Sequence, residues 1–308
     1  MIDVERLRSA YGSLLAVDDL SFTARPGEIF GLLGPNGAGK TTCISCICGL
    51  LKPTAGRVSG MGHDTAQDGR RARESLGVVP QEIALYDDLS APENLAYWGG
   101  AHRMHGRALR DRVQEVLSWV GLADRAREPV ARFSGGMKRR LNFACGIVHR
   151  PKVLLLDEPT VGVDPQSRVR LLELTRELAR DGATVLYTTH YMEEAESLCD
   201  RVVIIDHGRI LAQGTLPELR SLLGERDLLR FSGVFQPDFV HRIFSGDGID
   251  IVQADENAVT LALHDASGRL PSIFAVLAGA RAEIRGTRLS QPSLESLFIK
   301  LTGKELRE

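Results

Sequence analysis

The residues with the clearest chemistry stand together in one glycine-rich octapeptide, Gly34-Pro35-Asn36-Gly37-Ala38-Gly39-Lys40-Thr41. It fits the phosphate-loop pattern G-x-x-x-x-G-K-[ST] and lies between an expected strand at Gly27–Leu33 and an expected helix. Glycine lets a backbone curl its N–H groups around phosphate oxygens, and a helix N-terminus adds positive partial charge. We therefore expect Lys40 to meet the β- and γ-phosphates of a nucleoside triphosphate, Thr41 to bind Mg²⁺, and Thr42 to contact the nucleotide. The alternative is a chance match in a chain with 31 glycines.

A pair of neighbouring carboxylates, Asp157 and Glu158, ends the apolar run Val153-Leu154-Leu155-Leu156. Neighbouring side chains of a strand point to opposite faces, so the two acids can take separate roles. We expect Asp157 to bind Mg²⁺ and Glu158 to polarise the attacking water. The alternative is a strand that simply ends in acidic turn residues before Pro159. Beside a phosphate loop, the acidic pair favours hydrolysis of the triphosphate.

Five further peptides complete a larger pattern. They are Tyr11 ahead of Ala16-Val17, Gln81 after Val78-Val79-Pro80, Phe133-Ser134-Gly135-Gly136-Met137, Val161-Gly162-Val163-Asp164 and Thr188-Thr189-His190. With the phosphate loop and the acidic pair, the sequence resembles the ATP-binding cassette (ABC) ATPases. In that family similar peptides are, in the same order, the adenine-stacking aromatic, the Q-loop, the signature peptide, the D-loop and the switch histidine.

The resemblance implies a set of site residues. Gln81 and His190 would act in catalysis beside Glu158, and Gln81 would also contact the metal. ATP would be bound by the phosphate loop together with Tyr11, Ser134, Gly135, Gly136 and Asp164. In family members the signature peptide reaches the nucleotide of a second cassette, so two chains would sandwich two ATP molecules.

The signature peptide and the histidine have a physical rationale of their own. Ser134 is a favourable N-cap and Gly135-Gly136 leave backbone donors bare, so a helix start is offered to an anion. The alternative is an ordinary capped helix. His190 follows the apolar run Val185-Leu186-Tyr187 and could sense a γ-phosphate by a charge-assisted hydrogen bond, or it could be structural. Tyr11 could stack on a base or belong to the core.

The signature peptide departs from the family pattern at two positions. The family usually has Leu first and Gln fifth, where this chain has Phe133 and Met137. The donors of Ser134-Gly135-Gly136 are kept, so we expect the peptide still to cap a nucleotide.

Two longer stretches, residues 158–165 and 190–196, look like those of exporter-type cassettes. The tail, Pro292-Ser293-Leu294-Glu295 with Phe298 and Leu301-Thr302-Gly303, resembles the end of the accessory domain of daunorubicin-resistance ATPases. We therefore expect the ATP-hydrolysing subunit of an ABC exporter that powers efflux of a drug, antibiotic, lipid or ion through a separate membrane permease. A soluble ABC ATPase of translation or DNA repair, and an importer ATPase, are the alternatives.

Short apolar runs alternate with helical stretches along the first 225 residues. Runs typical of buried strands lie at Leu76–Val79, Lys152–Leu156, Ala183–Thr188 and Arg201–Ile205. Continuous apolar strands predict a mostly parallel sheet and hence an α/β domain, here a P-loop NTPase core. Strand signals stop between about residues 85 and 150, where helical patterns such as Arg110–Val120 predict an all-helical subdomain.

Residues 226–308 form a second expected unit with the element order βαββαβ. We expect strands at Leu228–Phe231, Asp250–Gln253, Ala258–Leu263 and Ala282–Thr287, helices at Pro237–Phe244 and Gly268–Gly279, and a terminal helix at Ser293–Leu301. This order is typical of a small α+β ferredoxin-like domain. Its sequence holds no ligand constellation, so a dimerisation or regulatory role and direct permease contact both stay open.

Composition limits the partners. The chain has 308 residues, 43% of them hydrophobic and 25% charged, and a net charge of −2, so no global field favours nucleic acid. The start lacks a signal-peptide pattern, and no uncharged apolar run reaches the roughly 20 residues that cross a bilayer. We expect a cytoplasmic protein, peripheral on the inner face of the cell membrane, whose partners are an integral-membrane permease and a second copy of itself. The five cysteines are expected to be buried, reduced thiols.

Overall fold

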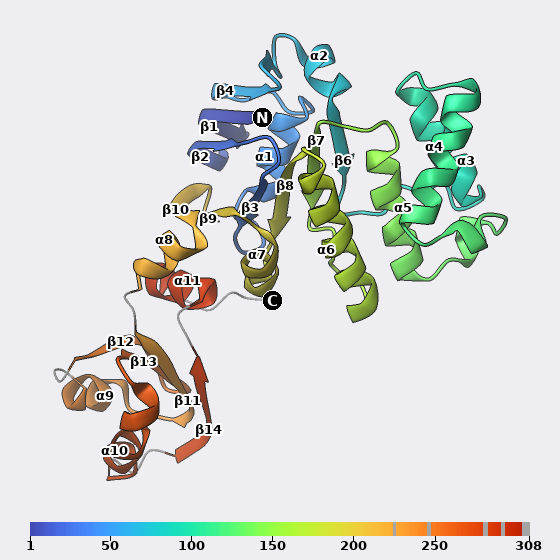
Figure 1. Cartoon of the computed structure of the whole chain (residues 1–308). Coiled ribbons are helices and arrows are strands. Elements are labelled where there is room, and N and C mark those ends of the chain that lie inside the picture. Colours follow the sequence, from blue (N-terminus) through green and yellow to red (C-terminus); the bar gives the residue numbers. More distant parts are fainter. Residues whose placement is uncertain (224–225, 245–247, 280–282, 291–292, 304–308) are drawn as a thin grey trace. The chain divides into compact units, whose positions relative to one another are not determined.

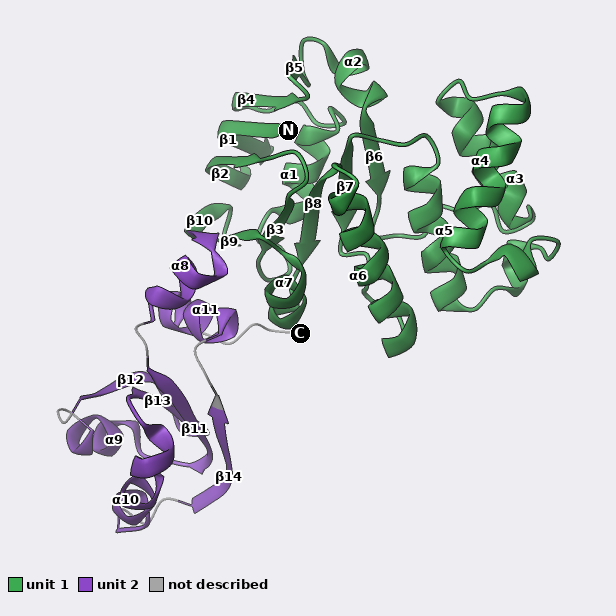
Figure 2. Ribbon diagram, in the orientation of Figure 1, with its two compact units in different colours: residues 1–212 green, residues 213–308 purple. Residues whose placement is uncertain are grey.

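The computed structural model describes residues 1–223, 226–244, 248–279, 283–290 and 293–303. The chain divides into two compact units, residues 1–212 and 213–308 (Figure 2). This division precedes the expected boundary at residues 225–226, because α8 (Leu216–Ser221) contacts α11 (Leu294–Thr302) and is counted with the second unit. Of the expected elements, Glu225 at the boundary, Ala282 in the last strand and Pro292 in the tail lie outside the described residues.

A six-stranded sheet with the order β10-β9-β3-β8-β7-β6 forms the centre of unit 1 (Figure 1). Its strands are β3 (Ile29–Leu33), β6 (Leu76–Val79), β7 (Val153–Asp157), β8 (Thr184–Thr189), β9 (Arg201–Asp206) and β10 (Arg209–Thr215). All pairs from β6 to β9 are parallel. Every residue of β3, β7 and β8 is buried, which explains their continuous apolar sequences. The expected α/β core is confirmed.

A second, antiparallel sheet with the order β2-β1-β4-β5 was not predicted from the sequence. It consists of β1 (Ile2–Tyr11), β2 (Leu14–Ala24), β4 (Ala55–Gly60) and β5 (His63–Asp64). The register of β1 shifts between Val4 and Leu7, and Arg6 in between has φ 45°. Such irregularities break the two-residue alternation that would have marked the strand. Helix α1 (Lys40–Ile47) contacts β2 and β4 on one side and β7 on the other, so it lies between the two sheets.

The helical subdomain lies in the sequence where it was expected. It contains α3 (Ala91–Ala101), α4 (Gly106–Trp119) and α5 (Gly135–Ile147), with short 3₁₀ turns at Ala123–Arg125 and Val130–Arg132. Ser90 and Glu93 form a capping box at the start of α3, and the Ser134 hydroxyl caps α5. Helix α5 contacts both β6 and α6 (Pro165–Arg180), so it connects the subdomain to the parallel sheet. Helices α2 (Gly69–Glu74) and α7 (Met192–Leu198) complete unit 1.

Unit 2 contains an antiparallel sheet with the order β12-β13-β11-β14. The elements run β11 (Asp227–Val234), α9 (Pro237–Ile243), β12 (Ile249–Ala254), β13 (Ala258–Leu263), α10 (Ala266–Gly279) and β14 (Glu283–Ser290). This is the βαββαβ order that the sequence predicted, with the first and third strands in the centre. Phe231, Val259 and Ile273 belong to its own hydrophobic core, separate from that of unit 1. Among the described helices of the chain, none is long and apolar enough to cross a membrane.

Candidate functional site

The order and register of three neighbouring strands bring the predicted residues to one edge of the parallel sheet. Strand β8 lies between β3 and β7, with Leu33 paired to Thr189 and Thr188 paired to Asp157. The next residue along each strand therefore leaves the sheet at the same edge. These residues are Gly34, Glu158 and His190. Ligands of open parallel sheets bind at this carboxyl edge.

The glycines of the phosphate loop are required by its backbone. A Cβ on Gly34 would lie 2.3 Å from the carbonyl oxygen of Ile205, and one on Gly39 would lie 2.6 Å from that of Ala16. Gly37 and Gly39 have φ values of 82° and 106°, which side chains disfavour. The loop then enters α1 directly at Lys40. Asn36 and Gly37 form its exposed tip, so the curl that a phosphate requires is open to a ligand.

Lys40 lies at the centre of the site, with its side chain only 4% exposed. Its Nζ donates to the carbonyl oxygens of Gly34 at 2.7 Å and Pro35 at 3.0 Å, and lies 2.9 Å from Glu158 Oε1. A buried ammonium of this kind is held by partners on every side. The residue predicted to bind phosphate, Lys40, is therefore in direct contact with the predicted base, Glu158.

Glu158 connects Lys40 to His190. Its second oxygen, Oε2, lies 2.9 Å from Nδ1 of His190. The backbone of Glu158 has φ 44°, a conformation that costs a non-glycine residue roughly 1–3 kcal/mol and is found at functional sites. Its N–H donates to the Thr188 hydroxyl at 3.0 Å, which fixes this turn to β8. The three side chains form one buried chain of contacts.

Asp157 points to a different set of partners from its neighbour. It accepts a 2.7 Å hydrogen bond from the Thr188 hydroxyl. Burial raises the pKa of its carboxyl, and hydrogen bonds from Thr188 and Thr41 oppose that rise. One buried carboxylate and the Thr41 hydroxyl suit Mg²⁺, which takes few protein ligands and completes its shell with phosphate oxygens and water. In the described part of the chain, no cluster of three or more His, Cys, Asp or Glu side chains offers a metal site independent of a nucleotide.

The signature peptide occupies the exposed start of α5. The Ser134 hydroxyl accepts from the Met137 N–H at 3.2 Å, and Gly135 has open space around it. Gly136 differs, because a Cβ there would lie 2.2 Å from Ser167 Oγ and 2.5 Å from Asp164 Oδ2. Among the described residues, neither Ser134 nor Gly135 makes a hydrogen bond or ion pair with the Lys40–Glu158–His190 cluster.

The remaining predicted residues lie at the surface. Tyr11 ends β1 with 51% of its area exposed, so it is not a core aromatic. Asp164 caps α6 by accepting from the Ser167 N–H at 2.9 Å, and this hydrogen bond lowers the pKa of its carboxyl. The side chain of Gln81 is exposed, but its carbonyl oxygen is bound.

The donor to that carbonyl, Arg139, is a buried residue that sequence reasoning missed. Its Nη1 donates to the Gln81 carbonyl at 2.5 Å, and its Nη2 to the Val161 carbonyl at 3.0 Å. Arg139 thus joins the Q-loop to the D-loop from within α5. A charged residue five positions after Ser134 on a helix gave no signal by itself, because such residues are usually solvated.

An apolar cavity of about 370 Å³ lies beside the Gln81 loop. Its lining includes Pro80, Ala84, Trp98, Cys145 and His149. Nε1 of Trp98 and Nδ1 of His149 are buried without a hydrogen-bond partner among the described residues. All five cysteines are free and buried, and burial raises the pKa of thiols such as Cys43 and Cys145, as expected for inert core residues.

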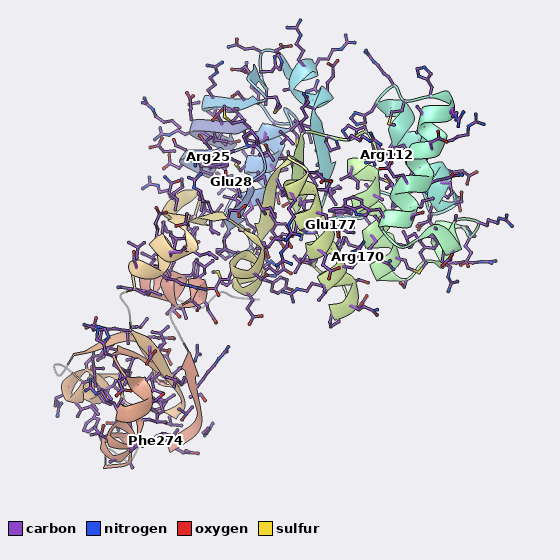
Figure 3. The ribbon with its side chains drawn as sticks, in the orientation of Figure 1. Arg25, Glu28, Arg112, Arg170, Glu177 and Phe274 are labelled. Carbon is purple, nitrogen blue, oxygen red and sulfur yellow. The ribbon has the colours of Figure 1, made fainter. Side chains whose placement is uncertain are left out.

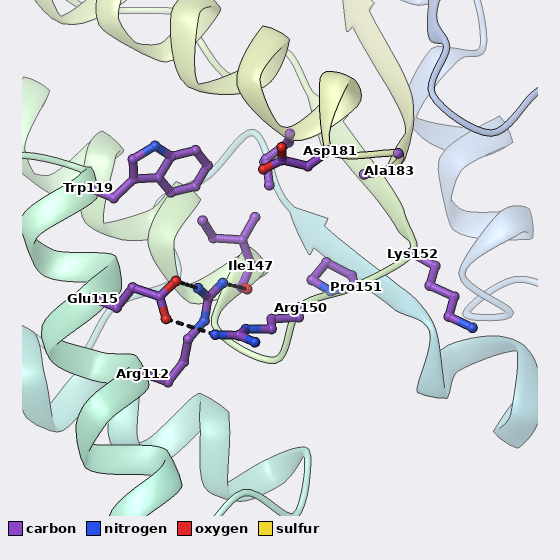
Figure 4. A pocket seen from close by; sticks show the side chains of 11 residues that line it. Arg112, Glu115, Trp119, Ile147, Arg150, Pro151, Lys152, Asp181 and Ala183 are labelled. Atoms are coloured by element: carbon purple, nitrogen blue, oxygen red, sulfur yellow. Dashed lines mark hydrogen bonds and ion pairs between the residues drawn. The ribbon is translucent and has the colours of Figure 1, made fainter.

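A second pocket lies at the opposite end of the parallel strands and is lined by a cluster of charged residues, Arg112, Glu115 and Arg150 (Figure 4). The contacts of this cluster indicate a structural role. Arg112 donates to the carbonyls of Ile147 and Val148 at 3.0 Å each, at the end of α5. Glu115 lies between the guanidinium groups of Arg112 and Arg150, 2.9 Å from each. These charges pair with one another and cap the last turn of α5.

Comparisons with known proteins agree with this geometry. The ABC transporter family pattern matches residues 17–161. The chain is 42% identical, over all of both proteins, to the linearmycin resistance ATP-binding protein LnrL of Bacillus subtilis. It is 36% identical to the daunorubicin resistance ATP-binding protein DrrA3 of Streptomyces coeruleorubidus, over 99% of this chain and 97% of that one. A solved dimeric ATP-binding cassette in a post-hydrolysis state, bound to ADP and phosphate, is similar with a TM-score of 0.63 and 26% identity, over 70% of this chain and 98% of its own.

Proposed function

This chain belongs to the ABC transporter ATPases, which hydrolyse ATP to drive transport, and we propose that it powers an exporter of drugs or antibiotics through a separate membrane permease. The observation that carries the site assignment is the buried contact chain of Lys40, Glu158 and His190 at the carboxyl edge of the sheet. In this contact chain, a cation that can bind phosphate, a carboxylate that can polarise water and an imidazole lie within hydrogen-bond distance of one another in sequence, Lys40 to Glu158 and Glu158 to His190.

We propose a separate task in hydrolysis for each of these three side chains. The triphosphate of ATP competes with Glu158 and the loop carbonyls for Lys40, which then holds the β- and γ-phosphates. Glu158, released from the ammonium, accepts a hydrogen bond from the attacking water and orients it as general base. His190 stays next to Glu158 and donates to the γ-phosphate.

Mg²⁺ would be held by the Thr41 hydroxyl and Asp157, with Gln81 reaching it from the Q-loop, and would neutralise charge that develops on the phosphates. The loop residues Gly34 to Thr41, with Thr42, would bind the phosphates through backbone N–H groups and the start of α1. Tyr11 is exposed and free to stack on adenine.

A second copy of the chain would complete each site. Ser134 and Gly135 are exposed, and the start of α5 presents backbone donors to an anion on another molecule. Gly136 and Asp164 would contribute indirectly, because their close contact holds the start of α5 against the D-loop. The similar solved cassette is a dimer, which supports this arrangement.

The permease would dock beside the Gln81 loop on the cytoplasmic face of the membrane. The apolar cavity there has room for one large apolar side chain of the permease. The Trp98 Nε1–H, which has no partner among the described residues, would donate a hydrogen bond to a polar group next to that side chain. The second unit would serve as an accessory domain, either for dimerisation or for permease contact.

Two measurements test the proposal. Purified full-length chain should release phosphate from ATP in the presence of Mg²⁺ and lose that activity in excess chelator. The chain should also co-purify with a multi-span membrane protein, whereas recovery of ribosomes or DNA ends would favour the soluble class. Ala84→Trp, which fills the cavity, should abolish co-purification and spare ATP hydrolysis, while Ala123→Trp on the exposed 3₁₀ turn should change neither.

A further inference from the structure

A fully buried carboxylate lies behind the catalytic cluster and has no role in the mechanism above. Glu194, on α7, has a side chain only 1% exposed. It belongs to none of the peptides that carry the phosphate, metal or water contacts. A buried acid is costly unless charged or polar partners satisfy it, so its surroundings require an explanation.

Four donors satisfy the two oxygens of Glu194. The Thr160 hydroxyl donates to Oε1 at 2.7 Å, and Arg168 Nε lies 2.6 Å from the same oxygen. The hydroxyls of Tyr187 and Thr189 donate to Oε2 at 2.8 Å and 3.0 Å. A carboxylate offers about four acceptor positions, and these four donors occupy them.

The four donors come from the three segments that carry the proposed chemistry. Thr160 stands two residues after Glu158, in the turn that leaves β7. Thr189 directly precedes His190 at the end of β8. Arg168 lies in the first turn of α6, which begins after Asp164 in the D-loop.

Glu194 also connects to the segment around His190 through a second contact. The Arg168 guanidinium lies 4.8 Å from the centroid of the Tyr191 ring, and the His190 and Tyr191 rings are 4.1 Å apart. The Thr189 hydroxyl, besides donating to Glu194, accepts from the Tyr191 N–H at 2.9 Å. The position of His190 is therefore fixed by neighbours on both sides that depend on one carboxylate.

We infer that Glu194 is a positioning residue that holds the base Glu158, the switch residue His190 and the start of α6 in one arrangement. The partners of its two oxygens are protein side chains, and it acts through the segments that carry the proposed catalytic residues. The inference rests on the proposed function, because it assumes that Glu158 and His190 act on ATP. A displacement of about 1 Å in a catalytic group can lower a rate by roughly a hundredfold.

The test is Glu194→Gln in the full-length chain. The amide keeps the size of the side chain but turns one acceptor into a donor that faces other donors. We expect kcat for phosphate release to fall at least about tenfold, while the Kd for ATP changes less than about twofold. Glu193→Gln, on the exposed neighbouring position of α7, is the matched control and should leave both constants unchanged.

A mutant cycle separates positioning from general loss of stability. In a His190→Ala background, one of the groups that Glu194 positions is already absent, so Glu194→Gln should lower kcat by a smaller factor than it does in the wild-type chain. If Glu194→Gln fails to fold, Tyr187→Phe and Thr160→Val each remove one donor and should lower kcat with Kd unchanged.

A wild-type kcat in Glu194→Gln, or a rate loss that multiplies fully with that of His190→Ala, would overturn the inference. A wild-type chain that hydrolyses no ATP would instead contradict the proposed function.

Discussion

Two clusters of ion pairs lie at opposite ends of the same parallel strands, and they differ in burial. In the Lys40–Glu158–His190 cluster the side chains are 4%, 5% and 15% exposed. In the Arg112–Glu115–Arg150 cluster they are 11%, 54% and 69% exposed. The distances are nearly the same, 2.9 Å in each pair. Solvent screens the second cluster, so ion pairs of equal length interact more strongly in the buried cluster, where we propose the chemistry, than in the exposed cluster, which caps a helix.

The largest difference between the two clusters is expected when Glu158 of the buried cluster is replaced. Glu158→Gln removes the charge that we propose orients the attacking water, but it keeps the size of the side chain. Turnover should fall by about 10²–10⁴-fold, the usual contribution of a general base, while ATP binding persists and a closed dimer accumulates. Single-turnover phosphate release and size-exclusion chromatography with ATP would measure both. Near-normal phosphate release would remove Glu158 from the role of base.

Lys40→Ala comes next. It deletes the cation that both the phosphates and Glu158 require, so the Kd for ATP should rise by about 10- to 100-fold, the value of a charged hydrogen bond. Equilibrium binding of a fluorescent ATP analogue measures this. Lys152→Ala, which removes an exposed lysine at the opposite end of the strands, is the control and should bind ATP normally. Unchanged affinity in Lys40→Ala would contradict the phosphate assignment.

A smaller, pH-dependent effect is expected at His149, beside the exposed cluster. Burial, and then the neighbouring charges of His102 and Arg112, lower the pKa of His149 from 6.5 to about 4. Between pH 6.5 and about 4, His149 is protonated in the unfolded chain but stays neutral in the folded chain. The free energy of unfolding therefore falls as pH drops from about 6.5 to about 4. At about 1.4 kcal/mol per pH unit, the loss amounts to about 3 kcal/mol at pH 4.

His149→Gln should therefore flatten the pH dependence of the free energy of unfolding in urea between these pH values. His207→Gln, which removes an imidazole that is 90% exposed, should leave the slope unchanged. Equal slopes in the wild-type chain and His149→Gln would show that the buried ring titrates normally.

The smallest effect is expected at Glu115. Burial alone would raise the pKa of Glu115, but hydrogen bonds from Arg112 and Arg150 outweigh this effect and lower the pKa. Because the pairs are partly exposed, Glu115→Gln should cost only about 0.5–1 kcal/mol of stability and leave ATP turnover unchanged. Urea unfolding and a steady-state ATPase assay measure the two quantities. A loss of turnover would show that the two ends of the sheet are coupled.

The sequence predicted the parallel core, the helical subdomain and the βαββαβ unit because their apolar runs are long and regular. The antiparallel sheet was missed, because bulges in β1 interrupt its alternation and its charged residues face outward. At the site, the sequence pattern predicted Lys40 at the end of the loop after β3, and Glu158 and His190 directly after β7 and β8. Spacing could not reveal that Glu158 contacts both others, or that Arg139 joins two loops, because such contacts depend on side chains from distant segments.

The double hold of Arg139 has a consequence for how the two loops respond to partners. One guanidinium on α5 thus holds a carbonyl of the Q-loop and a carbonyl of the D-loop. Further along the same layer, Trp119 donates to Glu177, which pairs with Arg170 on α6 (Figure 3). The helical subdomain is thus joined to the D-loop by Arg139 and to α6 by Trp119. If Arg139 couples the two loops, thermodynamic reciprocity requires that the effect of a partner at the Q-loop on binding at the D-loop equals the reverse effect.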